Sequence, residues 1–113
     1  MAEINQTKLA IATIRLLINS NAQIAHQESG GITDEYIIGD RETVRYSVAF
    51  NNSTKKYEIC MGLGTQELHV VCSETANTQT GGKIKKTFDE VAAAFGNQTT
   101  HSRLQNNRYD HAI

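Results

Sequence analysis

The sequence has 113 residues, of which 39% are hydrophobic and 20% are charged, and its formal net charge is −1. This composition is typical of a globular domain and excludes extensive disorder, while the length allows one hydrophobic core but not two. The near-zero net charge steers the chain neither toward nucleic acid nor away from it, so any recognition has to come from local patches.

The N-terminal residues do not have the basic start and unbroken apolar core of a signal peptide, because Arg15 interrupts the apolar run. No stretch approaches the roughly 18 apolar residues that a transmembrane helix requires. We therefore expect a cytoplasmic protein with no membrane partner. In such a protein Cys60 and Cys72 are expected to be free thiols rather than a disulfide.

The first predicted element is a helix over residues 7–28, ended by Gly30 and Gly31. Its polar positions form a narrow stripe, and leucines and isoleucines cover the remaining surface. A sheet buries a stripe of only about 100° on a helix. Part of the apolar surface of this helix would therefore stay uncovered by the sheet. Either the C-terminal segment covers the excess or a second copy or another protein does. We predict a homodimer through this helix, with contacts from Ile11 and Leu16.

The following residues predict a four-stranded antiparallel meander with strands over 36–38, 43–50, 55–61 and 66–72. The alternation in residues 43–50 places Val44, Tyr46, Val48 and Phe50 on one face. Turns centred on 52–53 and 63–64 would place Val48 opposite Tyr57 and Ile59 opposite Leu68, which keeps the apolar residues on that same face.

After the meander, residues 73–82 predict a mobile loop. Thr87 and Glu90 have the spacing of a capping box that begins a short helix, and Gly96 has the position of a C-terminal cap. Residues 97–113 are expected to be weakly anchored, and residues 99–111 are expected either to form one further short helix or to be disordered. The predicted fold of the single domain 1–113 is therefore α+β, with an N-terminal helix, the four-stranded meander, and one or two short C-terminal helices on one face of the sheet.

The polar face of the predicted sheet carries a candidate catalytic set, because Glu58 would oppose His69 and Cys60 would lie diagonal to it. A cysteine, a histidine and a carboxylate are the components of an activated thiol nucleophile. A flat sheet face offers no pocket or oxyanion hole, however, so we predict that the protein is not an enzyme. The four histidines share no short ligand spacing, so neither a metal nor another cofactor is predicted.

Acidic residues gather between positions 28 and 42, and such a patch can recognise a basic partner surface, although a solvated turn region would have the same composition. The leading interpretation is a small protein-binding module, a regulator or inhibitor that occupies a surface of a protein or nucleoprotein partner. The predicted contact residues in this patch are Glu28, Asp34, Glu35, Asp40 and Glu42.

The alternative interpretation is nucleic-acid binding through the C-terminal third. Residues 87–96 followed by 99–104 resemble a helix-turn-helix, with a glycine at the turn and a Ser/Thr-rich second helix, although Asn97 stands where an apolar residue usually follows the glycine. In this interpretation a basic cluster contacts phosphates and the second helix faces the major groove. The residues concerned are Lys83, Lys85, Lys86, Thr100, His101, Arg103, Asn106 and Arg108.

Overall fold

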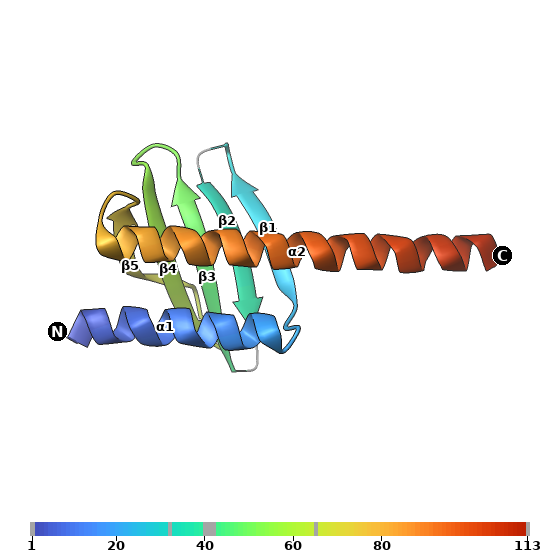
Figure 1. Cartoon of the computed structure of the whole chain (residues 1–113), viewed down its shortest axis with the longest axis horizontal. Coiled ribbons are helices and arrows are strands. Elements are labelled where there is room, and N and C mark those ends of the chain that lie inside the picture. The colour runs from blue at the N-terminus through green and yellow to red at the C-terminus, as the bar shows by residue number, and fades with distance from the viewer. Residues whose placement is uncertain (1, 32, 40–42, 65, 113) are drawn as a thin grey trace.

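The computed structural model describes residues 2–31, 33–39, 43–64 and 66–112, and it places the side chains of 6–28, 30–31, 33–39, 43–64 and 66–98. Two helices lie on one face of an antiparallel sheet in which every strand pairs with its neighbour in sequence (Figure 1). The elements are α1 (Ala2–Asn19), β1 (Ile24–Ser29), β2 (Thr33–Gly39), β3 (Val44–Asn51), β4 (Lys56–Leu63), β5 (His69–Thr75) and α2 (Gln79–Ala112). The α+β class and the antiparallel sheet are confirmed, but the described sheet has five strands rather than four. No described part of either helix combines the length and apolar character needed to cross a bilayer.

The predicted helix over 7–28 is wrong at its C-terminal end, because α1 ends at Asn19. Asn21 has a φ of 61°, and its N–H donates to the carbonyl of Ile18 while the N–H of Ala22 donates to the carbonyl of Leu17. This pair of bonds is a Schellman motif, which ends a helix at a left-handed residue. Residues 24–29 therefore form the edge strand β1, and Ile24 within it is buried in the core.

The register of β3 and β4 keeps the predicted apolar face but shifts the predicted pairs. Val48 lies opposite Ile59, and Phe50 lies opposite Tyr57. This shift of two residues leaves every side chain on its predicted face, because side chains alternate with a period of two. In the next pair Ile59 lies opposite Cys72, and a bulge follows Ile59. Leu68, the predicted partner of Ile59, lies before β5 and outside the strand.

The C-terminal third differs most from its prediction. Residues 73–75 belong to β5, and α2 begins where the loop over 73–82 was predicted. The hydroxyl oxygen of Thr78 caps α2 by accepting a hydrogen bond from the N–H of Gly81 at 2.9 Å. Thr87, the predicted cap, is fully buried inside the helix and donates to the carbonyl of Lys83. The helix then continues through Gly96, so the two short helices are one long helix.

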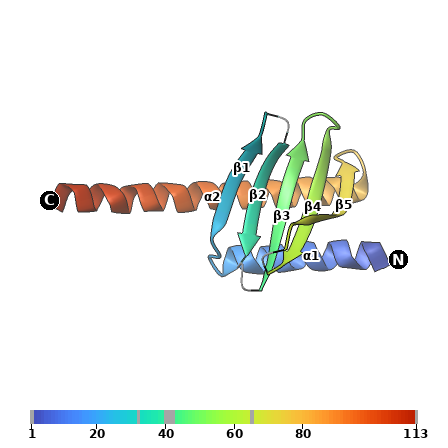
Figure 2. The ribbon, with the colours of Figure 1, turned by 180° about the vertical axis from the view of Figure 1, so that it is seen from behind.

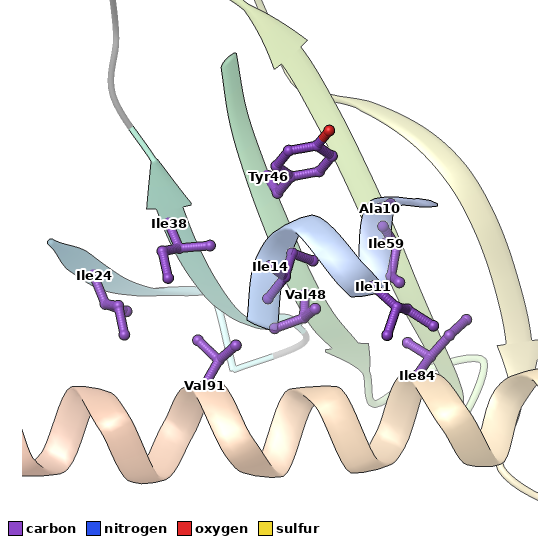
Figure 3. Close-up of a cluster of buried hydrophobic side chains, with 10 residues drawn as sticks. All are labelled: Ala10, Ile11, Ile14, Ile24, Ile38, Tyr46, Val48, Ile59, Ile84 and Val91. Carbon is purple, nitrogen blue, oxygen red and sulfur yellow. The ribbon is translucent and has the colours of Figure 1, made fainter. Parts of the chain in front are cut away.

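The core lies between the sheet and the two helices (Figure 3). Isoleucines dominate it, and both helices contribute side chains to it. The buried core residues are Ala10, Ile11, Ile14, Ile24, Ile38, Tyr46, Val48, Ile59, Ile84 and Val91. Ile11 is only 7% exposed and belongs to the core of the single chain, so little of its side chain is available for a contact between two copies. Of the predicted pair, Leu16 alone is exposed, at 65%.

Candidate functional site

The face of the sheet turned away from the helices is not covered by any described helix or strand (Figure 2), although residues 66–68 lie over Gly62 at one end of it. Its centre is built from small side chains on β3 and β4. Ser47, Ala49 and Cys60 are almost completely buried by their neighbours although no helix lies over them. We call this surface the open face; its centre is a shallow floor close to the backbone.

Two carboxylates stand on either side of this floor. Glu35 on β2 and Glu58 on β4 both lie opposite Ala49, one from each side. Because the two strands that carry them are separated by one strand, their backbones are about 10 Å apart. The open face therefore carries two acids at a spacing that the sheet itself determines.

Neutral side chains hold both carboxylates in place. Glu35 accepts hydrogen bonds from the hydroxyl of Ser47 at 2.8 Å and from the amide of Gln27 at 2.7 Å. Glu58 accepts one from the hydroxyl of Ser73 at 3.1 Å. Among the described residues, no lysine or arginine forms an ion pair with either acid. Their orientation is thus restrained while their charge is not neutralised.

A largely apolar row runs beside the acids across all five strands. Pairing aligns Ala25, Ile37, Ser47, Cys60 and Val70 in that order. Val70, on the edge strand β5, is 53% exposed. Next along β3 from this row, Arg45 donates a hydrogen bond to the carbonyl of Gln66, which holds its guanidinium at the end of the open face.

The cysteine, histidine and carboxylate considered for catalysis are not brought together. Glu58 lies opposite Ser73 rather than His69, and His69 lies opposite Met61, whose side chain packs against the helix-covered core. Burial raises the pKa of the Cys60 thiol, and the charges of Glu35 and Glu58 raise it further, against a hydrogen bond with Ser47 that lowers it. This environment favours the thiol over the thiolate, which is the nucleophilic form.

The predicted acidic patch is divided between the two faces of the sheet. Glu28 and Asp34 lie directly opposite each other on the helix-covered side, whereas Glu35 is on the open face. Asp40 and Glu42 lie outside the described residues. Of the acids of the predicted patch that the structure describes, only Glu35 therefore belongs to the open face. Glu58 joins it there, although the sequence alone placed Glu58 on the polar face of the sheet without assigning it a binding role.

A second group of polar side chains lies at the end of the β1–β2 hairpin. His26, Glu28 and Asp34 each have one side-chain atom that could coordinate a metal ion, a ring nitrogen or a carboxylate oxygen. These three atoms all lie within 4.8 Å of one another. The His26 Nε2 contacts a carboxylate oxygen of Asp34, and its ring stacks on Tyr36 with centroids 4.4 Å apart. Burial raises the pKa of Tyr36, and the charges of Asp34 and Glu28 raise it further. The sequence did not reveal this group because residues 24–28 were predicted to be part of a helix. In a strand, the side chains at positions 26 and 28 lie on the same face.

The predicted basic cluster lies in the first turns of α2 rather than in a loop before a helix. Lys83 and Lys86 line a shallow groove of about 360 Å³ between the helices, together with Lys8 and Arg15 of α1. Lys85 pairs with Asp89 at 3.2 Å, and this neighbour raises the pKa of Lys85.

The helix-turn-helix interpretation is wrong, because α2 has no turn at Gly96. The five residues predicted to read a nucleic acid lie on the continuing helix, and their side chains are outside the described part. They are Thr100, His101, Arg103, Asn106 and Arg108.

Comparison of the chain with known protein families, with curated proteins and with solved structures finds no match. Any function therefore has to be inferred from the geometry of this chain.

Proposed function

We propose that this chain is a cytoplasmic protein-binding module that acts as a regulator or inhibitor by covering a surface of its partner. The observation that supports this function is the open face, where two fixed, unpaired carboxylates stand beside an apolar row. Uncovered apolar surface is a common mark of an interaction site. Charges complementary to those of the partner fix the register of a complex and accelerate its formation.

The partner is expected to be a folded protein that presents basic side chains beside an apolar patch. Glu35 and Glu58 require two such groups about 10 Å apart, which is two strand spacings. Arginine fits best, because its guanidinium bonds a carboxylate through two parallel N–H groups. The same two negative charges disfavour a nucleic acid on this face, since they repel phosphate.

The experiment compares captures from the lysate of the native host by tagged wild-type chain and by a variant with Glu35→Gln and Glu58→Gln. These changes remove both charges and keep the side-chain shape. A matched control, Asp89→Asn with Glu90→Gln, removes two charges from α2 on the other side of the molecule. Each capture is divided in two, and one half is treated with nuclease. Bound proteins are quantified by mass spectrometry and bound nucleic acid by staining.

We expect discrete proteins that the wild type and the control retain and that the Glu35/Glu58 variant loses by about tenfold. Equal recovery by all three chains would show that the open face is not the binding surface. Among the described side chains, the nucleic-acid alternative relies on Lys83, Lys85 and Lys86. This alternative would be favoured if the bound material were nucleic acid. In that case nuclease would remove it, and the Glu35/Glu58 change would not affect its recovery.

The predicted homodimer stays a proposal, now limited to the outer surface of α1. Leu9 and Leu16 are 67% and 65% exposed and lie two helical turns apart. Two antiparallel copies of α1 would place Leu9 of each against Leu16 of the other, as a two-fold interface requires.

Two leucines bury far less surface than a stable complex, which buries about 800 Å² per partner. A weak dimer is therefore expected in light scattering at high concentration. Leu16→Glu should abolish it, and an unchanged mass would refute it.

A further inference from the structure

We propose that His26, Glu28 and Asp34 form a binding site for a divalent transition-metal ion, with Zn²⁺ as the best chemical match. The site lies on the β1–β2 hairpin, whose turn is at the upper end of the sheet in Figure 2. Its three ligands are on the helix-covered side of the hairpin, away from the open face. Metal binding is therefore independent of the proposed protein-binding function.

The pairing of β1 with β2 brings the ligands together. His26 and Glu28 are two residues apart on one strand and so share a face, and Asp34 lies directly opposite Glu28. Directly opposed residues have Cβ atoms about 5 Å apart. The ligand atoms already lie within 4.8 Å of one another. Glu28 is exposed, so its carboxylate can rotate inward to complete the site.

The imidazole is positioned before any ion arrives. Its ring stacks on Tyr36, and the ring of Phe95 from α2 lies 5.6 Å away between centroids. The Nε2 atom is the one that faces Asp34. A ligand held in this way loses little conformational freedom on binding, which favours affinity. When the ion binds, it replaces the contact between His26 and Asp34, and any proton held between them is released to solvent.

Electrostatics also favour a cation at this position. Glu28 and Asp34 are like charges directly opposite each other on neighbouring strands, an arrangement that destabilises a sheet. Within the described ranges, neither carboxylate has an ion pair with a lysine or an arginine. A divalent ion between the two acids would convert this repulsion into attraction.

The ligand types select the class of metal. One imidazole nitrogen and two carboxylate oxygens are ligands that Zn²⁺ accepts, and solvent can fill the fourth position of its tetrahedron. Mg²⁺ and Ca²⁺ bind oxygen ligands, and Ca²⁺ takes six to eight of them. Imidazole instead suits zinc, copper, iron and nickel. We therefore expect little binding of Mg²⁺ or Ca²⁺.

The test titrates the full-length chain with Co²⁺, whose visible absorption reports its coordination, and then displaces it with Zn²⁺. Calorimetry with Zn²⁺ gives the stoichiometry. One ion per chain is expected, and His26→Gln, Glu28→Gln and Asp34→Asn should each weaken binding by about tenfold or more. The matched control is His69→Gln, which removes an exposed histidine from the edge strand at the other side of the sheet and should leave the affinity unchanged.

Several results would overturn the metal site. These are no binding at millimolar Zn²⁺, unchanged affinity in Glu28→Gln and Asp34→Asn, or loss of binding in a variant with His101→Gln and His111→Gln. The Glu28→Gln variant keeps the proposal testable if His26→Gln fails to fold, because Glu28 is exposed and has no described packing role. The same variant leaves Glu35 and Glu58 intact, so the two proposals can fail separately.

Discussion

At the scale of single residues, Cys60 has an environment that suppresses its chemistry. It is 6% exposed, and burial together with two nearby carboxylates raises its pKa. Cys72 is half-buried on the opposite side of the sheet. We expect iodoacetamide to modify Cys60 several-fold more slowly than Cys72 in the native chain, as measured by peptide mapping after timed quenching. A faster reaction at Cys60 would indicate an activated thiol and reopen the catalytic hypothesis.

The raised pKa of Cys60 also gives a pH dependence of stability. The unfolded thiol loses its proton near its ordinary pKa of about 8.5, whereas the folded thiol keeps its proton at that pH. In this window the native state binds more protons than the unfolded state, so the free energy of unfolding falls as pH rises. Urea unfolding from pH 8 to 10 should show a steeper decline for the wild type than for Cys60→Ala. Parallel curves would contradict the raised pKa.

At the scale of elements, two glycines of α2 form a matched pair. An alanine Cβ at Gly96 would meet no atom within 4 Å, but at Gly81 it would lie 1.8 Å from the carbonyl oxygen of Thr75. Gly96→Ala should stabilise the protein by about 0.5–1 kcal/mol, because glycine is unfavourable inside a helix. Gly81→Ala should destabilise it by about 1–3 kcal/mol through overpacking. Urea unfolding measures both. Destabilisation by Gly96→Ala would indicate that the helix is interrupted at Gly96.

The elements that the sequence predicts well are those with one consistent periodicity. The alternation of β3 and β4 predicted their apolar face, because it is repeated in both strands. The boundaries of α1 and α2 were missed where local signals suit two structures. Gln23 and His26 continue a helical stripe, yet His26 and Glu28 also alternate as a strand requires. Thr87 and Gly96 look like helix ends, but the packing of Ile84 and Val91 against the core extends one helix through both positions.

Neither candidate site could be predicted fully, because each depends on strand register. Glu35 was expected in an acidic patch, but its bonds to Ser47 and Gln27 require three strands in the observed alignment. The metal site requires β1, which the sequence did not reveal. Residue types alone therefore indicated which side chains were available, whereas pairing determined which of them meet.

At the scale of the whole molecule, α2 extends well beyond the sheet at the β1 edge (Figure 1), and the molecule measures 57 × 29 × 23 Å. The last described contact of α2 with the sheet region is that of Gln98, which donates to the carbonyl of Ala22 and accepts from the N–H of Ile24. Because the ribbon of α2 extends past the β1 edge of the sheet (Figure 1), removal of residues 99–113 should leave the free energy of unfolding within about 0.5 kcal/mol of the wild type. Circular dichroism and urea unfolding measure this. A larger loss would show that the extension contacts the domain.

The strictly sequential order of the strands has a consequence for synthesis on the ribosome. Each hairpin closes over a short loop, so the sheet can form strand by strand as the chain emerges. Of the described elements α1 emerges first and α2 last, and α1 needs both the sheet and α2 to cover Ile11 and Ile14. Until α2 emerges, the nascent chain consequently carries an uncovered apolar helix, and we expect molecular chaperones to bind this helix.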